Sequence, residues 1–112
     1  MGLRTPQTLI NLLVIADAAV HYSVAVDIVW VQEKTGYVFG VMAAAPGRLD
    51  AWVEVSPDGT NYTRLGAVQN IVATGSLIFP WTTHSTWMRM GVQAPLWAAG
   101  SWTVNVIFEG KS

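Results

Sequence analysis

The residues of this chain that could carry acid–base or metal chemistry are few and widely spaced. Its two histidines, His21 and His84, are not followed two or four positions later by another histidine, a cysteine or a carboxylate. Spacing of that kind is what places two metal ligands on one face of a strand or a helical turn. The chain also lacks cysteine, which excludes disulfides, thiol catalysis and a cysteine-ligated zinc or iron–sulfur site. We therefore expect neither a metal nor a cofactor.

Carboxylate pairs and nucleophile motifs give no better sign of an enzyme. Asp50 and Glu54 fall on the same face of a predicted strand, about 13 Å apart at roughly 3.3 Å per residue. This separation is too long for the two carboxylates of a retaining glycosidase, and a solvated strand face explains the pair more simply. The chain has no Gly-x-Ser-x-Gly elbow, and the glycines of 36–40 lack the spacing of a phosphate-binding loop. The expected protein is not an enzyme.

The tryptophans are the best candidates for binding residues, since there are six Trp in 112 residues. Trp52 shares a predicted strand face with two carboxylates, so it is either an anchor at a subunit interface or a platform on which a sugar ring stacks. Trp81, Trp87 and Trp97 flank predicted loops, where core, subunit-interface and ligand-platform positions are all open to them. These four tryptophans are the interface candidates.

Charged residues are scarce and unevenly distributed. They make up 12% of the sequence, about half the usual share, while hydrophobic residues make up 52%. The net charge of -1 excludes a polybasic nucleic-acid-binding surface, and polar or proline residues interrupt the uncharged stretches too often for a membrane-spanning helix. Ten of the thirteen charges fall in the first 64 residues, and Arg89 is the only one between Leu65 and Phe108. We expect neighbouring subunits to cover the strands and loops of this second half.

Apolar residues alternate with a period of two along most of the chain, which predicts strands rather than helices. The clearest cases are 49–56 and 102–109, and in 21–31 the alternation puts Tyr22 and Ile28 on one face and Ser23 on the other. The predicted strands are roughly 8–15, 20–31, 37–45, 48–56, 60–65, 68–73, 76–81, 86–94 and 101–109. The first 19 residues form either an N-terminal arm or an edge strand.

Turn sequences separate these strands. In Ser56-Pro57-Asp58-Gly59-Thr60, Pro57 presets φ for the first turn position, Asp58 suits the second, and Gly59 can adopt a positive φ. This predicts a hairpin that joins 48–56 to 60–65, and further breaks are expected at 34–36, 46–47, 74–76 and 98–100. Such regular turns predict an all-β fold. We expect residues 1–112 to form one antiparallel β-sandwich domain, jelly-roll-like, with about eight or nine strands.

The segment 49–63, LDAWVEVSPDGTNYT, resembles a pattern of small structural proteins of tailed phages, in which a strand ending V-x-V-S-x-D-G-x-N-[WY] forms a hairpin. The segment 87–92, WMRMGV, is similar to their [YW]-x-R-x strand, and 101–110 resembles their closing strand. The resemblance covers roughly the last 65 residues. The same turn also occurs in carbohydrate-binding and adhesion sandwiches.

The resemblance implies a virion component that is made in the host cytoplasm, such as a capsid decoration protein, a head fibre or a tail-associated protein. Its implied partners are the major capsid protein or other virion proteins. We expect a non-enzymatic structural protein that forms a homo-oligomer, with a homotrimer favoured, and that binds no nucleic acid and no membrane. The alternative is a carbohydrate-binding or adhesion module, in which exposed tryptophans stack on a glycan.

Overall fold

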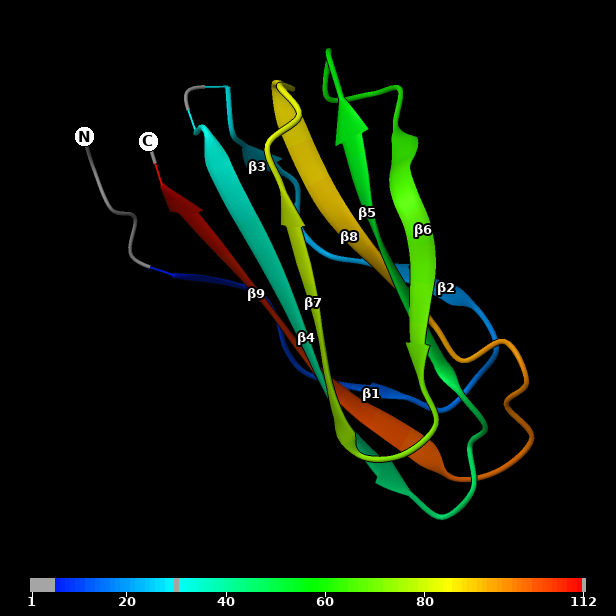
Figure 1. Ribbon diagram of the computed structural model, residues 1–112. Helices are drawn as coiled ribbons and strands as arrows, with labels where there is room; N and C mark the ends of the chain where they lie inside the picture. Colours follow the sequence, from blue (N-terminus) through cyan, green and yellow to red (C-terminus); the bar gives the residue numbers. More distant parts are fainter. Residues whose placement is uncertain (1–5, 30, 112) are drawn as a thin grey trace.

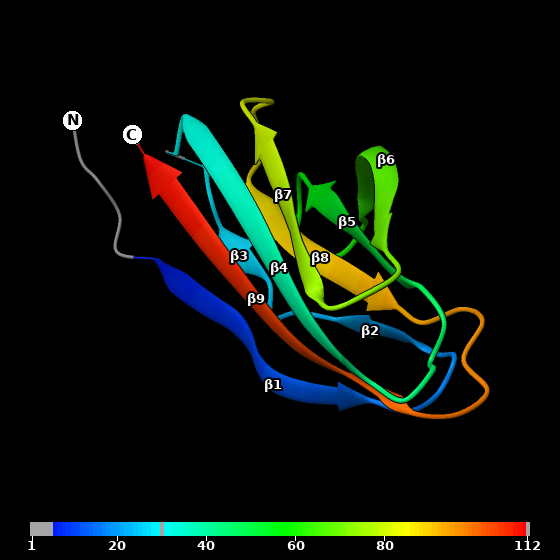
Figure 2. The ribbon, with the colours of Figure 1, turned by 60° about the horizontal axis from the view of Figure 1, so that its bottom comes forward.

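The structure is a computed structural model that describes residues 6–29 and 31–111. Within these residues, nine strands form two antiparallel sheets that pack face to face (Figures 1 and 2). The strands are β1 (Gln7–Ile15), β2 (Val20–Tyr22), β3 (Val26–Asp27), β4 (Glu33–Ala43), β5 (Leu49–Ser56), β6 (Thr63–Ile71), β7 (Gly75–Trp81), β8 (Trp87–Gln93) and β9 (Ser101–Lys111). Sheet A has the order β1-β9-β4-β7, and sheet B has the order β2-β8-β5-β6 with β3 also paired to β8.

The topology is that of one long hairpin, folded in half and rolled up. The fold point is the connection between β5 and β6, and from there outward β5 pairs with β6, β4 with β7, β2 and β3 with β8, and β1 with β9. Rolling the hairpin adds the β4–β9 and β5–β8 pairs. Counted with β2 and β3 as one interrupted strand, the eight strands form a jelly roll, which confirms the predicted fold class.

The core lies between the sheets and is lined by the inward-facing residues of each strand. On β5 these are the residues 49, 51, 53 and 55 that the alternation placed on one face, and on β9 they are 102, 104, 106 and 108. Trp102 is the largest fully buried side chain, and its Nε1 donates to the Gly47 carbonyl at 3.0 Å. Both alternation patterns are therefore confirmed.

The predicted strand 20–31 is wrong, because the chain leaves the sheet between β2 and β3. Ser23 is buried there, where its N–H donates to the Met90 carbonyl at 2.8 Å and its Oγ accepts from the Met90 N–H at 2.9 Å. Tyr22 consequently lies on the outer face, whereas Ile28 is fully buried. The alternation of side-chain types could not show this, because a hydroxyl that pairs with the backbone satisfies a buried position as well as an apolar group does.

Two predicted breaks also fall inside strands. Residues 34–36 lie in β4, where Thr35 and Gly36 pair with both β7 and β9, so sheet pairing overrides the local turn preference. The expected strands 60–65 and 68–73 are one strand, β6, which carries an irregularity opposite Ala51–Val53 and has Gly66 at a φ of 76°. The glycine therefore marks a bulge rather than an end. At the other end of the chain, β1 is an edge strand of sheet A.

Candidate functional site

The outer face of sheet B carries a cluster of charged and aromatic side chains. Glu54 on β5 lies in the same cross-strand row as Arg89 on β8 and Arg64 on β6. Arg89 Nε donates to Glu54 Oε1 at 2.8 Å, and Trp52 Nε1 donates to Glu54 Oε2 at 2.8 Å. Glu54 is only 7% exposed, so the expectation of a solvated carboxylate face is wrong at this position. The carboxylate is instead the acceptor that holds an arginine and an indole in place.

The two arginines of this cluster stack on aromatic rings. The Arg89 guanidinium lies 3.8 Å from the ring centroid of Tyr22 and 4.1 Å from that of Tyr62, and the Arg64 guanidinium lies 4.6 Å from that of Trp52. Such stacking is favourable, and the N–H groups in the plane of the guanidinium can still donate hydrogen bonds to other groups. Trp52 is only 2% exposed as a result, and this finding overturns its expected role as a solvent-facing platform for a sugar ring.

The other interface candidates are half-buried, each in a different place. Trp97 packs against the core and its Nε1 donates to the Gly100 carbonyl at 2.9 Å. Trp87 lies against the turn that joins β5 to β6. Trp81 lines a pocket of about 280 Å³ beside β6, and its buried Nε1 has no hydrogen-bond partner among the described residues. Their role at an interface stays a prediction, and Trp30 lies outside the described residues.

The turn at the fold point is held by one serine and one aspartate. Pro57, Asp58 and Gly59 lie in the 57–62 connection between β5 and β6, and Gly59 has a φ of 78°. Asp58 Oδ1 accepts from the backbone N–H groups of residues 60 and 61, both at 2.8 Å, and from the Ser56 hydroxyl at 2.9 Å. The backbone N–H groups of residues 61 and 60 are the largest causes that hold the pKa of the Asp58 carboxyl far below its ordinary value of 3.8. These hydrogen bonds hold the turn at the end of β5 in one conformation.

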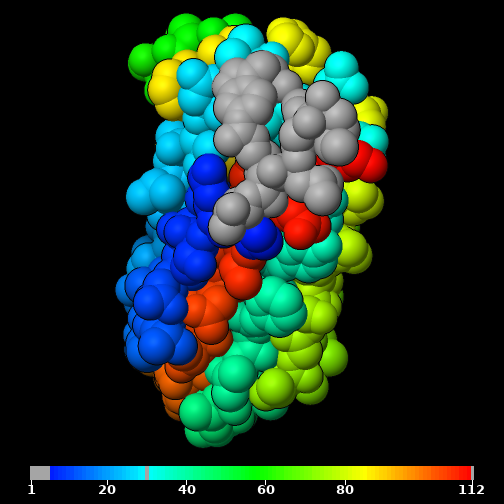
Figure 3. All heavy atoms as spheres, turned by 90° about the vertical axis from the view of Figure 1, so that its left-hand side faces the viewer, coloured from blue at the N-terminus to red at the C-terminus, as the bar shows by residue number. Residues whose placement is uncertain are grey.

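The outer face of sheet A carries many apolar side chains, and β1, β9, β4 and β7 lie side by side across it (Figure 3). Its cross-strand rows are Thr8–Ile107–Tyr37–Ile78, Asn105–Phe39–Ser76 and Val14–Thr103–Val41. Five of the apolar side chains on these strands are between 41% and 63% exposed, namely Leu12, Val14, Phe39, Val41 and Ile78. Tyr37 stacks on Phe39 with ring centroids 6.3 Å apart.

This face has no charged side chain in any of the three rows. The exposed charged residues of sheet A, Glu33, Glu109 and Lys111, lie at one end, where the Tyr37 hydroxyl donates to Glu109 Oε1 at 3.4 Å. The face also includes β1 and β4, which belong to the half of the chain that carries most of the charged residues. That neighbouring subunits cover the C-terminal strands and loops stays a prediction. The sequence already indicated that both faces of β4 are apolar. Residues 37–42, YVFGVM, are apolar in both phases of the alternation, which is typical of a strand covered on both faces.

Within residues 6–29 and 31–111, no group of three or more histidine, cysteine or carboxylate side chains could hold a metal ion. The same residues contain no helix long and apolar enough to cross a membrane. His21 lies on β2, where its Nε2 is 2.9 Å from Asp17 Oδ1, and His84 lies in the loop between β7 and β8, so the two histidines belong to different parts of the molecule.

The fold and its surfaces define an antiparallel jelly-roll sandwich with one apolar sheet face and one polar–aromatic sheet face. No protein-family model and no curated protein sequence matches the chain. Among solved structures it is similar to the crystal structure of the PBSX exported protein XepA, with a TM-score of 0.71 and 12% sequence identity. The match covers 96% of this chain but 37% of that one, and it shows a common fold.

Proposed function

We propose that this chain is a non-enzymatic structural protein of a phage-like particle, which acts by packing one face of its sandwich against other protein subunits. The observation that carries the proposal is the uncharged apolar face of sheet A. Exposed aromatic and aliphatic groups without interspersed charge are typical of the centre of a protein–protein interface. The fold that it shares with the PBSX exported protein XepA supports a phage-related β protein.

The size of the face bounds the interface that it can form. Strands β1, β9, β4 and β7 have 9, 11, 11 and 7 residues. At roughly 3.3 Å per residue and about 4.8 Å between strands, they cover about 600 Å², including the end that carries charged residues. A standard stable interface buries about 800 Å² on each partner. The outer face of sheet A is therefore somewhat smaller than a standard interface, so a stable contact would also bury part of the surrounding surface.

The finer role that we propose is capsid decoration or a head fibre, with the major capsid protein or another virion protein as the second partner. The protein would assemble as a homo-oligomer, with a trimer favoured, in which each copy turns the apolar face of sheet A towards its neighbours. Its place would then be the virion, and neither nucleic acid nor a membrane is a partner in this proposal.

Sedimentation velocity tests the assembly with two matched variants. Val41→Lys places a charge in the apolar face of sheet A, whereas Val72→Lys places the same charge on a 73% exposed valine in the loop between β6 and β7. We expect the natural protein and Val72→Lys to sediment as one oligomer and Val41→Lys as a monomer. A natural protein that stays monomeric at high concentration and has no affinity for any particle would contradict the proposal.

The alternative of a glycan-binding module with exposed tryptophans receives less support. Trp52, its first candidate, is covered by Arg64, and the three other candidates are half-buried. A saturable change of tryptophan fluorescence with a glycan panel, lost when Trp81, Trp87 or Trp97 is replaced by alanine, would reverse this preference.

A further inference from the structure

Lys34 is a buried lysine whose ammonium group is paired only with neutral groups. It lies on β4 facing the interior, is 2% exposed, and its Nζ donates to the carbonyls of Thr83 at 2.9 Å and Thr82 at 3.4 Å. No carboxylate of the described residues forms an ion pair with it. Burial lowers the pKa of the Lys34 ammonium below its ordinary value of 10.5. Burying a charged ammonium group without an opposite charge lowers the stability of the folded state unless other interactions compensate for the lost hydration.

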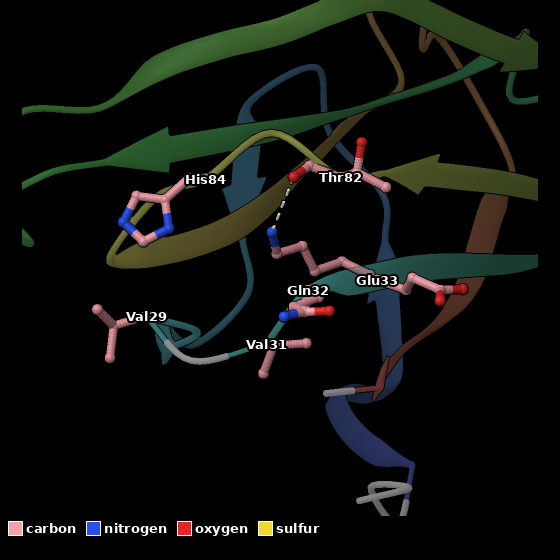
Figure 4. A pocket seen from close by; sticks show the side chains of 7 residues that line it. Val29, Val31, Gln32, Glu33, Thr82 and His84 are labelled. Atoms are coloured by element: carbon pink, nitrogen blue, oxygen red, sulfur yellow. Dashed lines mark hydrogen bonds between the residues drawn. The ribbon is translucent and has the colours of Figure 1, made fainter. Parts of the chain in front are cut away.

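The ammonium group lies beside a pocket of about 480 Å³ (Figure 4). His84 and Thr82 border the pocket on the side of the β7–β8 loop, and Gln32 and Val31 border it on the side of the segment that leads into β4. The dashed line in Figure 4 marks the Lys34–Thr82 hydrogen bond. The volume falls in the range of sites for small molecules.

The donors around the pocket suit an anionic oxygen group. An ammonium has three N–H donors, of which the two carbonyls of 82 and 83 accept two, so one remains for a ligand. The Gln32 amide and the His84 imidazole supply further donors from two other directions. The Gln32 amide oxygen and the Thr82 hydroxyl, which belong to residues lining the pocket, can accept hydrogen bonds from hydroxyl groups of such a ligand. The carboxylate of Glu33 points away from His84 and Val29 (Figure 4).

We propose that this pocket binds a small ligand that presents a carboxylate to Lys34 and hydroxyl groups to the oxygens around it, which is the chemistry of a sugar acid. The carboxylate supplies the counter-charge that Lys34 lacks, and a charge-assisted hydrogen bond of this kind is stronger than a neutral one. The site lies apart from the apolar face of sheet A, so the inference does not depend on the proposed assembly.

A purely structural role for Lys34 is the competing explanation. In that case the lysine only ties the 82–83 loop to β4, and the pocket stays filled with water. The two explanations differ in ligand binding and not in stability, because both expect the loop to loosen when the ammonium is removed. The test must therefore measure binding.

The experiment is an NMR titration of the full chain with glucuronate. Glucose is the matched probe, in which a hydroxymethyl group replaces the carboxylate, and acetate is the probe that lacks the hydroxyl groups. We expect saturable amide shifts centred on Lys34 and His84 with glucuronate, and at least tenfold weaker binding of glucose and of acetate. Lys34→Met, which keeps the length of the side chain, should abolish the shifts, and Lys111→Met should leave them unchanged.

Several outcomes would overturn the inference. They are no saturable shift with glucuronate, equal binding of glucuronate and glucose, or unchanged binding by a folded Lys34→Met variant. Should Lys34→Met fail to fold, His84→Gln decides, because the exposed His84 can be changed without touching the core. We expect a several-fold weaker affinity for glucuronate in that variant, and an unchanged affinity would contradict the site.

Discussion

The indole of Trp52 occupies the space in which a side chain of Gly91 would lie. The two residues are direct partners on β5 and β8, and a Cβ atom on Gly91 would be 2.4 Å from Cε2 of the indole. Tyr22 on β2 is the partner of Gly91 on its other side. The absence of a side chain at position 91 therefore lets two aromatic residues close over the outer face of sheet B, and the rest of the cluster depends on that gap.

Gly91→Ala should destabilise the protein by about 2 kcal/mol, because the indole cannot move away from the added methyl group without breaking its bond to Glu54. Denaturant unfolding measures the loss. Gly75→Ala is the matched control, since the nearest atom to its added Cβ is 3.6 Å away. Equal unfolding midpoints for the two variants would show that the packing of Trp52 on Gly91 is not restrictive.

Glu54→Ala should cost about 3 kcal/mol, because it leaves the partly buried Arg89 guanidinium and the Trp52 N–H without their acceptor. The comparison is Asp50→Ala, which removes a pair to the 40% exposed Arg48 side chain and should cost less than about 1 kcal/mol. A double-mutant cycle of Glu54→Ala with Arg89→Ala should show a favourable coupling energy. Additive effects would mean that the two side chains do not act as a pair.

Asp58→Ala should lower the thermal unfolding midpoint at pH 7, because the ionised carboxylate accepts hydrogen bonds from two backbone N–H groups of the turn. The pKa of Asp58 is lowered in the folded state, so its contribution to stability is present above the ordinary value of 3.8 and is lost as the pH falls towards the lower folded value. The difference in unfolding midpoint between the natural protein and the variant should thus shrink as the pH falls from about 4 to about 2, below the ordinary carboxyl pKa. Asp58→Asn, which keeps one acceptor oxygen, should be intermediate at pH 7, and a difference independent of pH would refute the account.

Ala44→Gly should stabilise the protein by about 0.5–1 kcal/mol, because Ala44 has a φ of 62°, a conformation that costs energy for any residue with a Cβ. Chemical denaturation measures the gain. Ala45→Gly is the natural control, since Ala45 is also exposed but has no positive φ, and the added chain entropy should lower its stability. A loss in both variants would contradict the prediction.

The sequence by itself determined the strands whose two faces differ in polarity. The alternation in β5 and β9 holds in the structure because residues two apart point to the same side of a sheet, so one set of side chains faces the core. In β5 most of the other set is buried as well, as Trp52 and Glu54 show. The turn chemistry of residues 56–60 located the fold point of the hairpin, since proline, aspartate and glycine act there through local sterics and hydrogen bonds. Both signals depend only on neighbours in the chain.

Contacts between distant positions were decided by the tertiary structure. Arg89 reaches Glu54 across 35 positions and Lys34 reaches the carbonyl of Thr83 across 49, and no local pattern marks either partner. The apolar residues of β4 show the same limit, because both phases of its alternation are apolar and only the sheet packing chose Val38 for the core and Phe39 for the surface. Sequence determines which side chains can be buried, and the closure of the two sheets determines which of them are.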